Sequence, residues 1–318
     1  SSEAGSFNFN PVALSAITMP VTVTVTAPGY GLWQYSDVYL VADDTLILDV
    51  DLSPGTEPTR YSFAKPRVET GGCQLQEELP TLTPEMLKSL QSLSVPSSIR
   101  VGRQSSGWPN CQQDGRGRYY TTVDVVPFKT YVKHVLPKEW IAGWPAESLR
   151  AGAMAAKMYG WYWISVGGKW RNYNPPADVM DSTCDQVYDP RVSYASTNAA
   201  VDATWNYAMV RNDAAFPLHY CSGCDDCYFC NCGQNCMGQR ESRDDANAGK
   251  TWQQILHRYY ADIDIQSLTS SGSTAHVDYA AWGNNGSVQQ RASGFSNWRH
   301  TVNGLYGHNR VHFLAYNS

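Results

Sequence analysis

The sequence is short of charge, of basic residues and of long apolar runs, and each shortage excludes a class of protein. Only 17% of its 318 residues are charged, against about 25% in an average soluble domain. No window approaches the roughly 18 consecutive apolar residues of a transmembrane segment. A net charge of −5 has the opposite sign to that of a dedicated nucleic-acid binder. The 11 Trp, 20 Tyr and 8 Phe exclude a disordered chain, so we expect a folded protein of about two domains.

The nine cysteines indicate the compartment. They are Cys73, Cys111, Cys184, Cys221, Cys224, Cys227, Cys230, Cys232 and Cys236. Six fall within residues 221–236, a density typical of disulfides outside the cell or of a metal site in a reducing cytosol. Lysine is scarce, Gly, Asn, Ser and Thr are common, and the sequence starts at Ser1 without an initiator Met. We therefore expect a processed protein that is secreted or held in the cell envelope, with one cysteine unpaired or paired with another chain.

Residues 1–98 are predicted to form a β-rich accessory domain. Residues 21–26 (VTVTVT) alternate apolar and polar side chains with the period of a half-buried strand. Residues 38–41 and 46–52 are two further candidate strands, and Thr-Pro at residues 83–84 predicts the start of one short helix. Two interpretations stay open. The domain is either a sandwich-like accessory module or an assembly module that forms a homo-oligomer or polymer through its edge strands.

Residues 99–265 are predicted to begin with strands and continue with helices, so the fold class is α+β. Strands are expected at residues 99–101 and 119–126. Cys73 and Cys111 are the isolated cysteines of the front half, and in an exported chain we expect a bridge between them. That bridge would tie the accessory domain to the second domain.

Helices are expected after Pro137. The first covers residues 144–163, where small residues on one face would allow close packing, and the second covers residues 192–205. A third begins at Thr251, because a glutamine three positions later completes a capping box. Residues 266–318 are predicted to form a C-terminal extension of short strands and loops.

Five segments follow one another in a recognisable order. They are residues 125–140 (VVPFKTYVKHVLPKEW), 144–159 (WPAESLRAGAMAAKMY), 176–188 (PADVMDSTCDQVY), 200–204 (AVDAT) and 248–260 (AGKTWQQILHRYY). Together they resemble the motifs of the SpoIID/LytB family, whose first motif is a strand and loop that precede a helix. The resemblance implies a mixed α+β domain over nearly half of the chain. Members of this family include lytic transglycosylases of bacterial cell-wall glycan and proteins that enhance a wall amidase.

The resemblance places the catalytic glutamate of the lytic transglycosylases at Glu139. One carboxyl group suffices for this reaction, because it first protonates the leaving oxygen and then accepts the proton of the attacking 6-hydroxyl of the sugar. Hydrolysis typically uses two carboxyl groups. An acid of this kind needs apolar neighbours, and Trp140, Ile141 and Trp144 follow Glu139. The candidate sugar-contacting residues are Asp181, Ser182, Gln186, Tyr188, Tyr220 and Ser222.

The chain departs from the family between the last two motifs. A long family segment, with an STSGG-like strip and a GHGxGMSQ motif, is compressed into residues 218–224 and the cysteine cluster. Residues 233–239 (GQNCMGQ) are a reduced version of the second motif. Gln234 stands nearest to the motif's histidine, and an amide cannot replace a histidine as a cation or general base. We therefore expect the shortened segment to affect how a glycan substrate binds.

The cysteine cluster at residues 221–236 has three interpretations. Disulfides within the cluster or to Cys184 are expected in an exported protein. A zinc site could use Cys184 with His219 or Cys221, because zinc binds sets of cysteine and histidine. An iron–sulfur cluster has similar spacing but also needs a Cys-Pro pair, which is missing. Outside the metal alternatives, the sequence predicts no cofactor.

The sequence thus supports three hypotheses of function. In the first, an exported protein cleaves or binds cell-wall glycan through Glu139. In the second, an extracellular structural subunit of a filament or surface layer keeps the fold without catalysis, and disulfides close its groove. In the third, the protein modifies the activity of a wall amidase. None of them involves nucleic acid or a transmembrane segment.

Overall fold

The computed structural model describes most of the chain. The described residues are 18–63, 79–104, 111, 113–226 and 232–268, together with three strands beyond residue 276. Residues 14–268 form one compact unit, and residues 1–13 with 269–318 form a second. Helices and several small sheets make this a mixed α+β fold, as the sequence predicts. Among the described residues, no helix is both long enough and apolar enough to cross a membrane.

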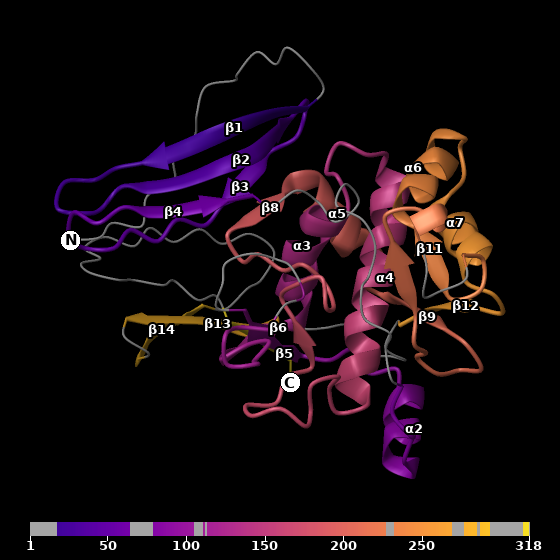
Figure 1. The fold of residues 1–318 in the computed structure, drawn as a ribbon. Coiled ribbons are helices and arrows are strands. Elements are labelled where there is room, and N and C mark those ends of the chain that lie inside the picture. Colours follow the sequence, from indigo (N-terminus) through magenta and orange to yellow (C-terminus); the bar gives the residue numbers. More distant parts are fainter. Residues whose placement is uncertain are drawn as a thin grey trace. The chain divides into compact units, whose positions relative to one another are not determined.

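A three-stranded sheet lies near the N-terminus of the larger unit (Figure 1). Its strands, in the order β1-β2-β4, are β1 (Thr18–Val25), β2 (Trp33–Val41) and β4 (Thr59–Ser62). β1 confirms the predicted strand, because its valines are partly buried and the threonines between them are exposed. The expected strand at residues 38–41 is the end of β2, which is longer than predicted.

The strand β3 (Leu46–Leu48) belongs to a different sheet. It pairs antiparallel with β8 (Val192–Tyr194), a strand almost 150 residues further along the chain. Trp33 and Tyr35 of β2 share a hydrophobic cluster with Val192 and Tyr194, so this cluster joins the N-terminal strands to the rest of the unit. In the part of the chain that the structure describes, the strands before residue 98 do not form the two facing sheets of a sandwich.

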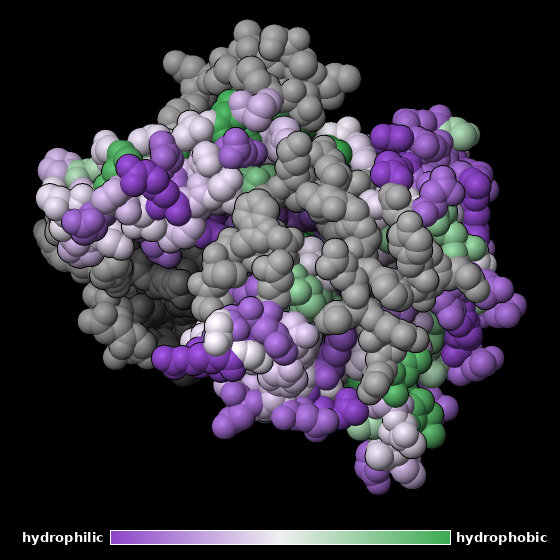
Figure 2. Space-filling model, viewed as in Figure 1, coloured by the Kyte–Doolittle hydropathy of each residue, from purple (hydrophilic) through white to green (hydrophobic). Residues whose placement is uncertain are grey.

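The next sheet, in the order β6-β5-β7, precedes the helical core. It contains β5 (Ser98–Arg103), β6 (Thr122–Pro127) and the two-residue strand β7 (Val179–Met180). α2 (Pro84–Gln91) comes before it and confirms the predicted short helix, since the Thr83 hydroxyl caps it. Figure 2 shows hydrophobic residues beside α2, where leucines at positions 79, 82 and 87 are exposed.

α3 (Phe128–Glu139) corrects the expectation of a strand and loop in the first motif. Only β6 is extended there, and the helix follows it directly. The buried apolar residues of α3 stand at positions 128, 131, 132, 135 and 136, which is helical spacing. Pro137 lies in the last turn of α3, and the helix ends two residues later. A proline is tolerated there better than in the middle of a helix.

α4 (Ala146–Ser165) confirms the predicted Ala-rich helix and is the central element of the unit. α3 and α5 (Ala195–Thr204) pack on it, and so do α6 (Gln239–Asn247) and α7 (Trp252–Tyr259) (Figure 1). Its small residues allow close approach as predicted, because a methyl group on Gly152 would lie 2.5 Å from the Trp140 ring.

Lys157 is the buried cation of α4. Its ammonium group donates hydrogen bonds to the carbonyls of Thr204, Trp205 and Tyr207, at the C-terminal end of α5. Burial lowers the pKa of Lys157 to about 7. The three carbonyls satisfy all its N–H donors, so this lysine has a structural role in joining α4 to α5.

The remaining elements complete the larger unit. The predicted helix at residues 192–205 is in fact β8 followed by α5, whereas α7 begins after Thr251 with the predicted capping box. The other elements are β9 (Tyr207–Val210), β10 (His219–Cys221), the 3-10 helix η1 (Cys224–Asp226), β11 (Cys236–Gly238) and β12 (Asp264–Ser267). The sequence did not predict α6, because its buried residues Gln239, Ser242 and Asp245 are all polar.

The smaller unit contains an antiparallel sheet, in agreement with the strands expected in the C-terminal extension. Its strands, in the order β14-β13-β15, are β13 (Val277–Asn284), β14 (Ser287–Ala292) and β15 (Leu314–Asn317).

Candidate functional site

Glu139 is the last residue of α3 and is completely buried, with 0% of its surface exposed. One carboxylate oxygen, Oε1, accepts a hydrogen bond of 2.7 Å from the backbone N–H of Val187. The other, Oε2, lies 3.3 Å from the side-chain amide nitrogen of Gln239, which also donates 2.7 Å to the backbone carbonyl of Glu139. The Gln239 amide therefore holds both the carboxyl group and the carbonyl at the end of the helix.

Gln239 is the first residue of α6 and is also fully buried. Its contact with Glu139 joins residues 100 positions apart. The amide oxygen of Gln239 is buried and has no hydrogen-bond partner within the described residues. Because buried polar atoms are almost always paired, this oxygen marks a position where a hydrogen-bond donor would be stabilising.

A hydrogen-bonded network around Trp140 supports this pair. The indole N–H of Trp140 donates to the Ser242 hydroxyl over 3.2 Å, and that hydroxyl lies 2.8 Å from the hydroxyl of Ser148. Ser242 in turn donates to the backbone carbonyl of Gln239 over 2.7 Å. Because Gly152 has no side chain, the Trp140 ring can lie directly on α4.

Gln186 is buried beside the pair and connects three elements. Its amide nitrogen donates to the Tyr220 hydroxyl over 2.7 Å and to the carbonyl of Ala156, while its oxygen accepts from the Tyr131 hydroxyl over 3.0 Å. Burial raises the pKa of Tyr131 well above its ordinary value, so this hydroxyl remains a donor. The Tyr220 ring packs edge-on against Trp140, with 4.9 Å between the ring centroids.

Two short parallel strands bring the family's compressed segment to Glu139. β10 contains His219 and Tyr220 and pairs with β11, which leads directly into Gln239. After β10, the carbonyl of Ser222 accepts a hydrogen bond from the backbone N–H of Arg240. Tyr220 and Ser222, predicted as sugar contacts, therefore lie beside the Glu139–Gln239 pair in the fold.

The other predicted contacts form a separate group. Asp181 accepts a 2.9 Å hydrogen bond from the backbone of Gln104 and lies 3.4 Å from the Arg103 guanidinium. Burial raises the pKa of Asp181 to about 6. The guanidinium of Arg103 also lies over the ring of Tyr188, whereas Ser182 accepts a hydrogen bond within its own turn. Arg103 of β5 thus contacts both Asp181 and Tyr188, and the Tyr188 ring also stacks on Tyr131 with 5.2 Å between the ring centroids.

Lys138 links Glu139 to the N-terminal sheet. Burial lowers the pKa of Lys138 to about 8, and its ammonium group lies 3.6 Å from the centre of the Phe63 ring. The neighbouring carboxylate of Asp189 accepts hydrogen bonds of 2.6 Å from Tyr35 and 2.7 Å from Arg191. This charged cluster is buried between the N-terminal strands and the segment that follows the third motif.

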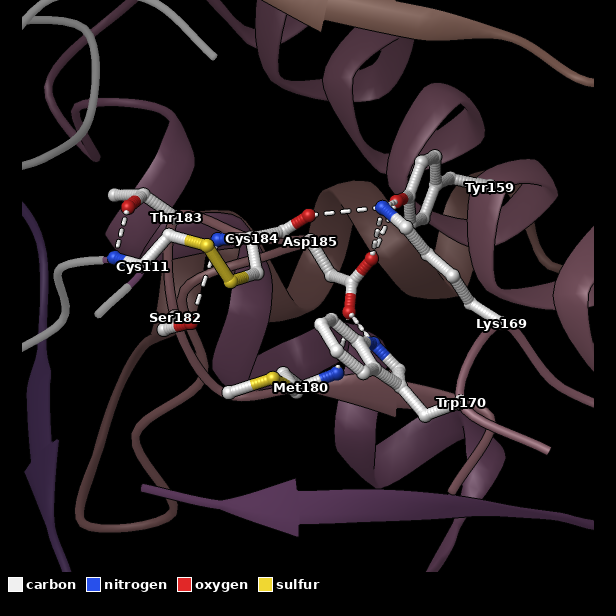
Figure 3. The surroundings of a disulfide bond; sticks show 9 residues. All are labelled: Cys111, Tyr159, Lys169, Trp170, Met180, Ser182, Thr183, Cys184 and Asp185. Atoms are coloured by element: carbon white, nitrogen blue, oxygen red, sulfur yellow. Dashed lines mark hydrogen bonds and ion pairs between the residues drawn. A yellow bond between two sulfur atoms is a disulfide. The ribbon is translucent and has the colours of Figure 1, made fainter. Parts of the chain in front are cut away.

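Cys111 forms a disulfide with Cys184, which corrects the expected bridge from Cys111 to Cys73. The two Cα atoms lie 4.7 Å apart, within the range that a disulfide spans. The backbone N–H of Cys111 also donates to the Thr183 hydroxyl, so the loop before β6 lies against the third motif (Figure 3). Cys73 lies outside the described residues.

The cysteine cluster is also oxidised. Cys224 is bonded to Cys232, and Cys221 and Cys236 are in disulfides as well, with their own two sulfurs 3.8 Å apart. Cys184 and Cys221, two residues of the expected zinc alternative, therefore carry no free thiolate in this state. Cys227 and Cys230 lie outside the described residues.

Asp185 is the buried anion next to the Cys111–Cys184 disulfide. Figure 3 shows Tyr159, Lys169 and Trp170 converging on its carboxylate. The Trp170 indole donates over 2.6 Å, the Tyr159 hydroxyl over 2.8 Å and the backbone of Met180 over 2.7 Å, and the Lys169 ammonium lies at 2.7 Å. These partners make Asp185 a structural anchor.

Together, the fold and this site define an α+β protein with one deeply buried carboxyl group at a helix end, held by an amide from a distant helix. Residues 116–210 match the model of the SpoIID family, described as "Stage II sporulation protein". This part of the chain thus matches a SpoIID domain, in agreement with the resemblance of the sequence motifs. A protein of Brachyspira hyodysenteriae, described only as uncharacterised, is 39% identical over 84 residues, or 26% of this chain. The match spans 22% of that relative's length.

Sequence reasoning missed two parts of the site. Gln239 was noted only as the end of the reduced motif, although that motif's terminal glutamine was the signal that could have placed it in the site. The contact from Val187 could not be predicted from the sequence, because its donor is a backbone N–H and not a characteristic side chain.

Proposed function

We propose that this protein is exported and acts on bacterial cell-wall glycan, with Glu139 as the acid–base group of a lytic transglycosylase. The contact between Glu139 and Gln239 carries the proposal. It unites the glutamate of the first family motif with the last residue of the reduced GHGxGMSQ motif.

The proposed reaction uses one carboxyl group twice. Protonated Glu139 gives its proton to the glycosidic oxygen as the bond to the anomeric carbon breaks. The resulting carboxylate then takes the proton from the sugar's 6-hydroxyl, whose oxygen bonds to the anomeric carbon. The products are a 1,6-anhydro sugar end and a free hydroxyl end, and Glu139 returns to its protonated form without a second carboxyl group.

The surroundings of Glu139 offer polar groups for a sugar. The amide oxygen of Gln239, which has no partner among the described residues, can accept a hydrogen bond from a hydroxyl group. Trp140 adds an apolar wall. Apolar walls with a few polar groups are typical of small-molecule sites.

Two observations support export. Disulfides persist in oxidising compartments, and four cysteines of the cluster and the pair at residues 111 and 184 are all oxidised here. The low charge and the aromatic content of the sequence agree with a secreted or envelope protein.

The test is digestion of purified glycan strands by the wild-type protein and by Glu139→Gln. We expect 1,6-anhydro products from the wild type and a loss of at least about a thousandfold in the variant, because the proton donor is removed. Glu147→Gln is the matched control: Glu147 also lies in this domain, but it caps α7 through the backbone N–H of Trp252. Equal activity of wild type and Glu139→Gln would refute the assignment.

A second candidate function is a non-catalytic structural subunit of an extracellular assembly. The observation in its favour is the complete burial of Glu139, since a substrate must reach a catalytic carboxyl group. The long strand β1 pairs only with β2 among the described strands, and such an edge can pair with another copy. Concentration-dependent polymerisation without any anhydro products would establish this alternative.

A further inference from the structure

A cluster of four aromatic rings lies near the Cys111–Cys184 disulfide, outside the site around Glu139. Tyr119 and Tyr120 precede β6, and Trp170 and Tyr173 follow α4. The Trp170 centroid lies 5.0 Å from those of Tyr119 and Tyr173, and the Tyr120 ring stacks on Tyr173 at 5.7 Å. Each ring therefore contacts at least two of the others.

Two of these rings are buried and fixed. Trp170 is 6% exposed and donates to Asp185, as Figure 3 shows, while Tyr120 is 4% exposed and donates to the carbonyl of Pro175 over 2.8 Å. Both belong to a small hydrophobic cluster that contains Cys184. The buried rings thus form a rigid base on a disulfide-linked part of the domain.

The other two rings face solvent. Tyr173 is 38% exposed and Tyr119 is partly exposed. In the described structure neither hydroxyl has a hydrogen-bond partner. Burial and the neighbouring Tyr119 raise the pKa of Tyr173, so its hydroxyl stays neutral at physiological pH. Rigid aromatic rings with free hydroxyls lose little entropy on binding and offer both an apolar face and a polar edge.

We propose that Tyr119 and Tyr173 form a stacking surface for a pyranose ring of a glycan strand, a second sugar site of this protein. The choice of cell-wall glycan as the ligand rests on the proposed function. The C–H face of a pyranose packs on an aromatic ring, and its hydroxyl groups need polar partners at the rim. Exposed side chains at Arg171, Asn172 and Asn174 supply such partners next to Tyr173.

Other ligand classes fit this surface less well. A stable protein partner usually buries about 800 Å² on each side, whereas Tyr173 is the only large hydrophobic residue of the cluster that is strongly exposed. A single-stranded nucleic acid would also stack on tyrosine, but it requires a basic surface that a net charge of −5 does not favour.

One short segment connects this surface to the proposed catalytic group. Asp185 binds the indole of Trp170, and Val187, two residues later, donates to Glu139. Two residues of chain span at most about 7 Å between Cα atoms. A strand held at the aromatic surface would therefore contact rings that pack on Trp170, which is hydrogen-bonded to the segment that orients Glu139.

The test measures sedimentation of the protein with purified, insoluble peptidoglycan sacculi. All variants carry Glu139→Gln, so that cleavage does not release the ligand. We expect Tyr173→Ala to weaken binding roughly threefold to tenfold, and the double variant with Tyr119→Ala to weaken it further. Tyr173→Phe keeps the ring and should retain most of the affinity. Thermal unfolding of each variant confirms that it is folded.

Tyr207→Ala is the matched control, because Tyr207 is 36% exposed and also contacts a tryptophan, Trp252, in a different part of the domain. Equal losses in Tyr207→Ala and Tyr173→Ala, or no loss in the double variant, would overturn the inference. So would a protein that does not sediment with sacculi at all. Normal sedimentation without anhydro products from the wild type refutes only the proposed catalysis.

Discussion

Replacement of Asp189 by asparagine tests how firmly the N-terminal sheet is attached to the SpoIID domain. The carboxylate of Asp189 accepts from the Tyr35 hydroxyl, 154 residues away, and from Arg191 at 2.7 and 3.0 Å. Burial alone would raise its pKa, but these hydrogen bonds and the charges of Arg191 and Lys138 lower it from 3.8 to about 2. The folded state therefore favours the ionised form.

The magnitude follows from this shift. A difference of nearly two pKa units corresponds to about 2.5 kcal/mol of stability at neutral pH. Between pH 4 and pH 2 the unfolded chain binds its proton first, so this contribution is lost as the pH falls through that window. Asp189→Asn also removes the carboxylate partner of Arg191, and breaking a buried pair in this way costs about 3 to 5 kcal/mol.

The assay is urea unfolding followed by tryptophan fluorescence, at pH 7 and at pH 3. We expect Asp189→Asn to lower the free energy of unfolding by about 3 kcal/mol at pH 7 and by clearly less at pH 3. Asp114→Asn is the control, since the pKa of Asp114 is also about 2 but its partners, Arg116 and Arg118, lie in the same exposed turn. Those contacts can persist in the unfolded chain, so we expect little change. A loss for Asp189→Asn that is the same at both pH values would refute the reasoning.

Two further predictions concern packing and cross-linking. Removing the disulfide with Cys111→Ser and Cys184→Ser should lower stability by roughly 4 kcal/mol, because the bridge closes a loop across 73 positions. Urea unfolding measures the loss, and a change below about 1 kcal/mol would contradict it. Gly152→Ala should cost about 1 to 3 kcal/mol in thermal unfolding, since its methyl group would lie 2.5 Å from a buried indole. Gly115→Ala, where the added methyl meets nothing within 4 Å, should be neutral, and equal effects of the two would exclude overpacking.

Each element that the sequence predicts well has a recognisable pattern within its own short stretch of residues. β1 has a strict alternation, α2 and α7 have a cap, and the small residues of α4 mark the face that packs closely. α3 has the helical spacing too, but the resemblance implied a strand and loop there. The sequence of α6 has no apolar residues at helical spacing, because the side chains that α6 buries are polar. Its stability depends on tertiary contacts that no short window contains.

Only residues that belong to a recognised motif could be predicted as parts of the site. Glu139 could be placed by resemblance, whereas the role of Tyr220 and Ser222 as sugar contacts stays a prediction; in the structure Tyr220 packs on Trp140 and Ser222 bonds Arg240. The amide of Gln239 could not be assigned its role, because the pairing depends on how β10 and β11 bring α6 back to α3. The disulfide partner of Cys111 could not be chosen for the same reason: spacing along the chain does not say which loop lies against the third motif.

Residues 184–187 explain why these features depend on one another. In this segment Cys184 holds the disulfide, Asp185 anchors Trp170, Gln186 bonds Tyr220, and the backbone of the next residue orients Glu139. The carboxyl group is therefore oriented by a segment that is fixed at three other points, and not by its own helix alone. A change at the disulfide or the aromatic cluster should reach Glu139 through this backbone, whereas a change at Asp181, whose partners are Arg103 and the backbone of Gln104, should not.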